Sequence, residues 1–243
     1  MVSTLSLTTK SSEFEVSYFP SLDLDDKKWE LGLLNFQAYN TIPNIDTRNN
    51  KFHFDDGKGV IEIPTGSYEI KQISEYLSEK INEYYQKNNK NSSEGDDELK
   101  VLILEGNTKT LKTEIWCIYS IDFTQDHSIG TFLVFSKEIL SAKETHISES
   151  TLNISKVNVI RIITNITTGA YVNNKPTPSI FEFALAIDPG FKISITPQNI
   201  IYFPIIVKNI TNLHIKVVDQ DFDLVDFRGE SISILLHLRE IKI

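Results

Sequence analysis

A chain of 243 residues with 40% hydrophobic and 10% aromatic residues is long enough for one large β domain with a substantial core. Its formal net charge of −9 disfavours nucleic-acid binding, because neutralising phosphates requires clustered Lys and Arg side chains and no basic stripe is present. The one cysteine, Cys117, excludes an intramolecular disulfide and favours a reducing compartment, and neither a signal-peptide pattern nor an apolar run of about 18 residues is found.

The first part of the chain predicts strands that follow a flexible start. Residues 1–12 are rich in Ser and Thr and are expected to form a flexible N-terminal arm. Strands are predicted at residues 13–19 and 28–39, and a hairpin at residues 52–63, where Asp56-Gly57 supplies the turn.

One helix is predicted near residues 68–87. Apolar side chains recur there at helical spacing, including Ile73, Leu77 and Ile81, and Thr65-Gly66-Ser67 offers a cap before them. The polar residues 86–98 are expected to form an exposed or disordered loop inside one domain, because strand-like sequence resumes directly afterwards. We therefore predict a single domain over residues 13–243.

The second part of the chain is rich in β-type runs. In the last of them Ile232, Ile234, Leu236 and Leu238 alternate with polar residues, which indicates a strand with one face on a core. A long turn-rich connection is expected at residues 168–190. The predicted strands of this part are residues 99–105, 112–123, 130–135, 157–167, 200–210, 213–219 and 231–241.

Nine or ten strands, one helix and several long connections favour a particular all-β architecture. Long crossovers between antiparallel strands suit a jelly roll better than a simple meander. The predicted fold is a single jelly-roll β-sandwich of two antiparallel sheets, with one inserted helix near residues 68–87.

The residue types of metal and catalytic sites do not form a convincing pattern. The five histidines, none of them in a His-x-His pair, are His53, His127, His146, His214 and His237. Cys117 lies in a run typical of a buried strand, where a cysteine acts as a small hydrophobic residue, and no nucleophile elbow is present. Glu182 remains a glycosidase candidate only by elimination.

The acidic turn Asp219–Glu230 resembles a calcium loop more closely than any other segment does. It has carboxylates at positions one, three, five and twelve, but Leu224 stands at position six, where a calcium loop requires glycine. A solvated hairpin tip is the favoured interpretation, and cation binding stays open. We predict no catalytic, cofactor-binding or metal-binding residues and no enzyme activity.

Five blocks, in order along most of the chain, resemble a capsid-protein family. The family is carried by Polintons, the virus-like transposons also called Mavericks, and by related adintoviruses. The blocks are Trp29–Ile45 (WELGLLNFQAYNTIPNI), Ile61–Leu77 (IEIPTGSYEIKQISEYL), Val157–Asn174 (VNVIRIITNITTGAYVNN), Pro197–Ile205 (PQNIIYFPI) and Val217–Leu238 (VVDQDFDLVDFRGESISILLHL).

The resemblance implies a structural protein of a virion. The major capsid protein of that lineage is a longer double jelly roll that forms hexon trimers, so this length is similar to the minor capsid protein, or penton. The expected partners are four further copies in a vertex pentamer and the major capsid protein. Tyr171, Phe181 and Phe183 are candidate interface residues, although burial within the same subunit is as plausible, and the N-terminal arm is a candidate tie to neighbours.

Three alternatives stay open beside the penton. A hexon-related jelly-roll protein or a domesticated host copy would belong to the same structural class. A jelly-roll lectin or cytokine-like trimer is a binding module and typically has a signal peptide or disulfides, which this sequence does not show. The expected location is the virion, assembled inside the host cell without secretion through a signal peptide.

Overall fold

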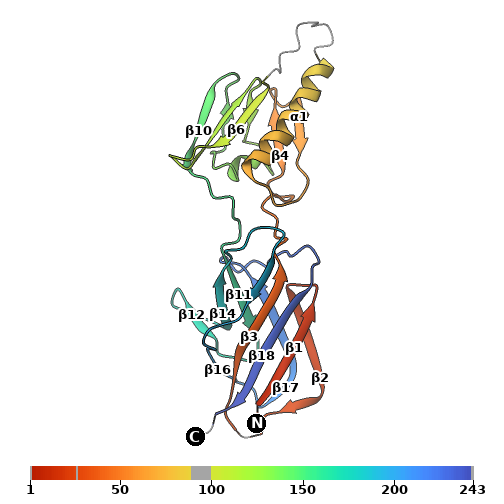
Figure 1. Cartoon of the computed structure of the whole chain (residues 1–243), viewed down its shortest axis with the longest axis vertical. Coiled ribbons are helices and arrows are strands. Elements are labelled where there is room, and N and C mark those ends of the chain that lie inside the picture. The colour runs from red at the N-terminus through yellow and green to blue at the C-terminus, as the bar shows by residue number, and fades with distance from the viewer. Residues whose placement is uncertain (1, 26, 89–99, 242–243) are drawn as a thin grey trace. The chain divides into compact units, whose positions relative to one another are not determined.

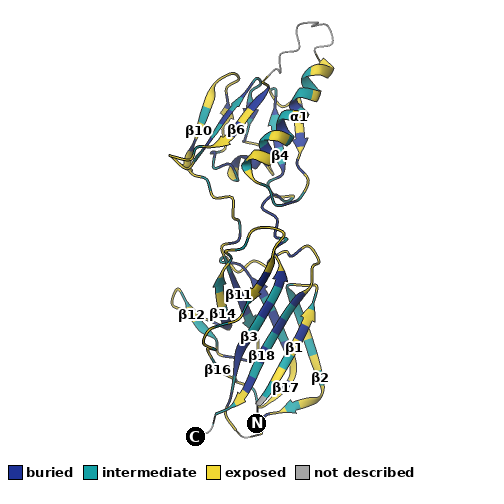
Figure 2. Cartoon of the chain, in the orientation of Figure 1, coloured by how far each residue is buried: buried dark blue, intermediate teal, exposed yellow. Residues whose placement is uncertain are grey.

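The computed structural model describes residues 2–25, 27–88 and 100–241, and it divides the chain into two compact units (Figure 1). Met1–Ile42 and Val157–Ile243 form one unit, called the sandwich unit here. Pro43–Lys156 form the other, called the inserted unit. Residues 13–243, expected to form a single domain, are thus divided between two units, because the inserted residues bury their own separate core (Figure 2).

The sandwich unit consists of two antiparallel sheets with four strands on the main path of each. The first has the order β1-β18-β3-β15, and β16 also pairs with β3; its strands are β1 (Val2–Thr9), β18 (Ile232–Glu240), β3 (Trp29–Tyr39), β15 (Lys192–Ile195) and β16 (Phe203–Pro204). The second has the order β14-β11-β17-β2; its strands are β14 (Ser179–Ala184), β11 (Val159–Thr164), β17 (Asn209–Val218) and β2 (Glu13–Asp23).

The order of these strands along the chain is that of a jelly roll. β1, β2 and β3 alternate between the two sheets, and after the insertion β15, β17 and β18 alternate again. The period of two in β18 places Ile232, Ile234, Leu236 and Leu238 in the core between the sheets. The predicted all-β jelly-roll sandwich is confirmed, and the inserted unit interrupts it between β3 and β11.

Two segments expected to be irregular are strands. Residues 2–9 of the expected flexible arm pair with β18 along their whole length, from Val2 opposite Arg239 to Thr9 opposite Ile232. Leu7 is buried there, so the cross-strand partner compensates for the Ser- and Thr-rich composition. The connection at residues 168–190 contains β14 and a hairpin of β12 (Ala170–Val172) and β13 (Lys175–Thr177). By contrast, only the short β16 and the first residues of β17 lie in the strand expected at residues 200–210.

The inserted unit packs one helix with two small sheets. One sheet has the order β5-β4-β8-β9, with β5 (Gly59–Glu62), β4 (Lys51–Phe54), β8 (Ile121–Asp122) and β9 (Ile139–Leu140). The other has the order β10-β7-β6, with β10 (Thr145–Thr151), β7 (Lys112–Cys117) and β6 (Leu102–Gly106). The strand expected at residues 130–135 is absent, because Ser128 caps a short 3₁₀ helix, η1 (Ile129–Thr131), at this point.

Helix α1 (Ile70–Asn88) confirms the predicted helix. Ile73, Leu77 and Ile81 recur every four residues on one face and are completely buried. Two serines on the helix also cover the free side of β6: the Leu104 N–H donates to Ser74 Oγ (3.2 Å), and Ser78 Oγ donates to the Leu102 carbonyl (3.3 Å). Most of the expected polar loop at residues 86–98 lies outside the described residues. None of the described helices has the length and apolar character needed to cross a bilayer.

Candidate functional site

The histidines are separated in the structure. Among the described residues, no group of three or more His, Cys, Asp and Glu side chains is arranged to hold a metal ion. His214 Nε2 lies 3.0 Å from a carboxylate oxygen of Glu13, and His237 Nδ1 lies 2.6 Å from the Tyr202 hydroxyl. The other three are in β4 (His53), in β10 (His146) and in a turn (His127).

Protein groups hold the start of the acidic turn. The Asp219 Oδ1 accepts the N–H groups of Asp221 (2.9 Å) and Asp223 (3.0 Å), which curls the turn back on itself. From β11, the buried Arg161 guanidinium donates to the carbonyls of Asp219 (3.1 Å) and Gln220 (2.8 Å). The positive charge of Arg161 is therefore held against the backbone carbonyls at the start of this turn.

The two remaining catalytic candidates lie on strands of different units. Glu182 on β14 lies opposite Arg161 on β11 and accepts its Nε–H at 2.5 Å. Cys117 is buried at the end of β7, and desolvation raises the pKa of its thiol to about 11. A thiol with so high a pKa is a poor nucleophile at neutral pH.

The two sides of the sandwich unit expose different apolar groups. Edge strands β1 and β2 lie on one side, called the β2 flank, while β14, β16 and the hairpin β12–β13 lie on the other, called the β16 flank (Figure 1). On the β2 flank Phe19 is completely exposed. On the β16 flank Tyr171 is 78% exposed, Ile201 59% and Ile206 61%.

Of the three candidate interface residues expected from the sequence, the structure leaves one exposed. Tyr171 projects from the β12–β13 hairpin. Phe181 and Phe183 instead pack against the sandwich core, and the ring of Phe183 lies 5.4 Å from that of Phe36. Phe19 was missed, although the pattern of β2 contains its signal: Phe14 and Tyr18 face the core, so an aromatic residue directly after Tyr18 faces away from it.

A polar cluster on the outer face of the first sheet fixes the segment that presents Ile201. Arg239 forms two hydrogen bonds with a carboxylate oxygen of Glu30 and stacks on the ring of Tyr202, with its Cζ 3.4 Å from the ring centroid. The segment passes so close to β3 that a Cβ atom at Gly32 would lie 2.5 Å from Ile200 Cγ2. The position of this part of the β16 flank is therefore defined by the sheet beneath it.

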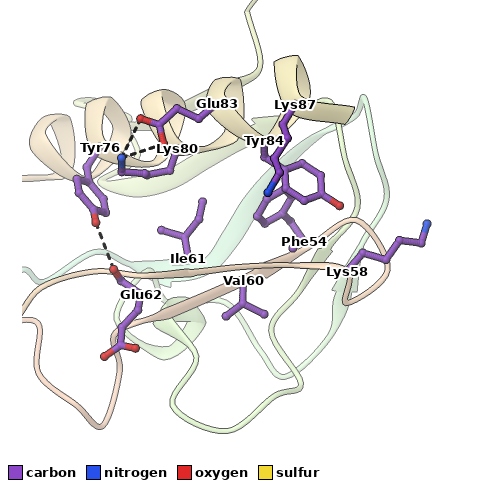
Figure 3. Close-up of a pocket in the computed structure, with 11 residues that line it drawn as sticks. Phe54, Lys58, Val60, Ile61, Glu62, Tyr76, Lys80, Glu83, Tyr84 and Lys87 are labelled. Atoms are coloured by element: carbon purple, nitrogen blue, oxygen red, sulfur yellow. Dashed lines mark hydrogen bonds and ion pairs between the residues drawn. The ribbon is translucent and has the colours of Figure 1, made fainter. Parts of the chain in front are cut away.

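The inserted unit has a groove of about 460 Å³ between helix α1 and strand β5 (Figure 3). Phe54 and Ile61 lie between the helix and the strand, and the aromatic rings of Tyr76 and Tyr84 come from the helix. The charged residues that line the groove are Lys58, Glu62, Lys80, Glu83 and Lys87. Sequence reasoning missed this groove, because its two walls are separate elements whose packing no local pattern reports.

Comparison with solved structures shows a likeness that covers the whole chain. No protein-family model matches the chain, and no curated protein matches it. The crystal structure of the selenomethionine-labelled mavirus penton protein is similar to this chain, with a TM-score of 0.51 and 13% sequence identity. The match covers 99% of this chain and 100% of the mavirus chain, so it includes both units. The chain therefore has the fold of a viral penton protein over its whole length.

Proposed function

We propose that this protein is a minor capsid protein, or penton, that forms pentamers at the icosahedral vertices of a Polinton-like virion. The observation that supports this most strongly is the whole-length likeness in fold to the mavirus penton protein. A single jelly roll whose two flanks expose different apolar residues agrees with that role. The other proposed partner is the major capsid protein of the same virus.

The two flanks suit a closed ring. In a cyclic ring each subunit contacts its neighbour through two different surfaces, which must complement each other. We infer that the β2 flank of one subunit packs on the β16 flank of the next, so that Phe19 is buried against Tyr171, Ile201 or Ile206. Burial of a large aromatic side chain at an interface favours association by roughly 1.5–3 kcal/mol.

The oligomeric state of the purified full-length protein tests this proposal. Light scattering should give a mass near five times 27.7 kDa, and negative-stain images should show five-fold rings. Phe19→Asp should abolish rings without unfolding the protein, because the native side chain is exposed. Leu111→Asp, at a 60% exposed apolar position in a turn of the inserted unit, is the matched control and should leave the mass unchanged.

A trimer and a monomer would have different consequences for the proposal. A trimer would favour the hexon-related or cytokine-like alternatives over a penton. A monomer would require the surrounding shell for pentamer formation, so the same variants would then be co-expressed with the major capsid protein. Failure to enter vertices even in that setting would exclude the penton role.

A further inference from the structure

Strand β5 of the inserted unit has a free edge. In the described part of the chain it ends its sheet, with β4 as its one neighbour. The other neighbour of β4 is β8, and on that side the N–H groups of Lys51 and Asp55 donate to the carbonyls of His127 and Ser120. The backbone N–H and C=O groups of successive residues in a strand point to opposite sides. Those of Phe52 and Phe54 in β4 therefore point towards β5.

The same alternation shows which groups of β5 face outward. Ile61 and Gly59 are opposite Phe52 and Phe54 and form the hydrogen-bonded pairs with β4. The N–H and C=O groups of Val60 and Glu62 therefore point away from the sheet, into the groove. The Tyr76 hydroxyl, which donates to the Glu62 carbonyl over 3.3 Å, supports this direction. An added strand would displace this hydroxyl and donate one of its own N–H groups to the Glu62 carbonyl.

Helix α1 forms the opposite wall at a fixed position. Its three buried isoleucine and leucine residues anchor it to the core, and Tyr84 packs edge-on against Phe54 with ring centroids 4.9 Å apart. The Tyr84 hydroxyl donates to an Asp55 carboxylate oxygen at 2.9 Å, which ties the helix to the turn before β5. An edge strand facing a helix across an open groove is the arrangement in which an extended peptide adds to a sheet.

The charge of the groove indicates the chemistry of the peptide. Lys58 and Lys87 lie towards the end of the groove where β5 begins, and Lys80 lies nearer the other end (Figure 3). Glu83 pairs with Lys80 at 2.9 Å, whereas Lys58 Nζ lies 3.9 Å from the nearest carboxylate oxygen of Asp55, so Lys58 is held less closely by its acidic partner than Lys80 is. A basic end of this kind, in a chain with a net charge of −9, favours a ligand with a carboxylate there.

We propose that the inserted unit binds an extended peptide segment of a partner protein, which adds as a strand to the free edge of β5. About four peptide residues pair with the four-residue strand, and an acidic side chain of the peptide meets Lys58 and Lys87. The main-chain hydrogen bonds supply affinity, and the groove beside Ile61 selects an apolar side chain. This proposal does not depend on the oligomeric state of the protein.

A phage-displayed library of random linear peptides, selected on the full-length protein, provides the probe. The enriched sequences should combine acidic residues with β-branched or aromatic residues and should lack proline at the paired positions. A fluorescein-labelled synthetic peptide of the enriched sequence then gives the affinity by anisotropy. N-methylation of alternate peptide amides should weaken binding about tenfold at the positions that pair with β5 and should have little effect at the others.

Val60→Pro tests the edge from the protein side. Proline removes the outward N–H of Val60 and leaves the hydrogen bonds to β4 in place, and Gly59 before it has no Cβ to clash with the proline ring. The variant should bind the peptide about tenfold more weakly, whereas Val60→Thr, which keeps the N–H, should bind like the native protein. If Val60→Pro does not fold, the N-methylated peptides decide alone.

The lysines are tested with a neutralising pair. Replacing Lys58 and Lys87 together by Gln should weaken binding about two- to fivefold and reduce its salt dependence. Lys109→Gln, in an exposed turn of the same unit, should change neither. Three results would overturn the proposal: no enriched peptide, equal affinity for native protein and a folded Val60→Pro variant, or no alternation in the N-methyl series.

Discussion

The sandwich unit builds its core from two separate segments of the chain, and the inserted unit builds its core from one. The sandwich unit joins Met1–Ile42 to Val157–Ile243, so each of its sheets contains strands from both ends of the chain. The inserted unit uses one continuous segment, short strands and a helix that covers β6. The sandwich thus has two distinct flanks, while the inserted unit closes locally and, among its described residues, leaves the edge of β5 without a neighbouring strand. If the two proposals hold, the sandwich unit serves assembly and the inserted unit serves recognition.

The largest loss of stability, confined to one unit at a time, should come from replacing a buried phenylalanine in its core. Phe36 packs against Phe183 and Phe227 in the sandwich, and Phe52 packs against Phe54 and Phe123 in the inserted unit. Both are completely buried, so Phe36→Ala and Phe52→Ala should each cost about 3–5 kcal/mol. Calorimetry of the full chain should show two transitions, of which each variant lowers a different one. If both variants lowered the same transition, the units would not be independent.

Arg161 should be the most important polar residue of the sandwich unit. Arg161→Met keeps the apolar stem but removes the hydrogen bonds to Glu182 and to the Asp219 and Gln220 carbonyls, so we expect a loss of about 2–3 kcal/mol. Urea unfolding measures this loss. Lys216→Met on β17, which removes a half-exposed ion pair with Glu13, is the control and should cost less than about 1 kcal/mol.

A smaller difference should appear between two strand glycines. Gly32→Ala in β3 would place a Cβ atom 2.5 Å from Ile200 Cγ2 and 2.9 Å from the Ile201 carbonyl oxygen, so it should cost about 1–2 kcal/mol. Gly106→Ala in β6 of the inserted unit meets its nearest atom at 3.7 Å and should be neutral or slightly stabilising. Equal thermal midpoints for the two variants would show that the segment over Gly32 is free to move.

Acid should destabilise the inserted unit through Asp46. Hydrogen bonds from Arg48, and then the Lys156 ammonium, hold the pKa of this carboxyl well below its usual range. The stabilisation is therefore complete above the unfolded pKa of about 3.9 and is lost as the pH falls below it towards the folded value. We expect a loss of about 1 kcal/mol in the inserted unit's transition. Asp46→Asn should remove this part of the acid dependence; an unchanged pH profile would assign it to other carboxyls.

Sequence patterns predicted the elements whose structure is specified by neighbouring residues in the chain. The alternation in Ile232–Leu238 and the spacing of Ile73, Leu77 and Ile81 specify a strand and a helix without reference to the rest of the chain. β1 could not be predicted, because residues 2–9 become a strand through pairing with β18, which is more than 200 residues away in sequence. The division into units was missed for the same reason: the partners of β3 follow the insertion.

The candidate surfaces show the same limit. Tyr171 was expected at an interface and is exposed, whereas Phe181 and Phe183, two strand positions apart, have their rings against the core. A sequence shows that such residues alternate with others but not which face of an edge strand is covered. Lys58, in the turn before β5, and Lys87, in α1, line one groove only because the tertiary packing places these two segments beside each other.

The pairing of β1 with β18 has a consequence for synthesis on the ribosome. The inserted unit leaves the ribosome complete and can fold early, while β1, β2 and β3 wait for partners that are translated afterwards. β18 is also a central strand, between β1 and β3, so a chain released before it is made lacks the middle of its first sheet. Any ring built on this sandwich would therefore admit only subunits whose translation had run through β18, and incomplete products would be excluded before assembly begins.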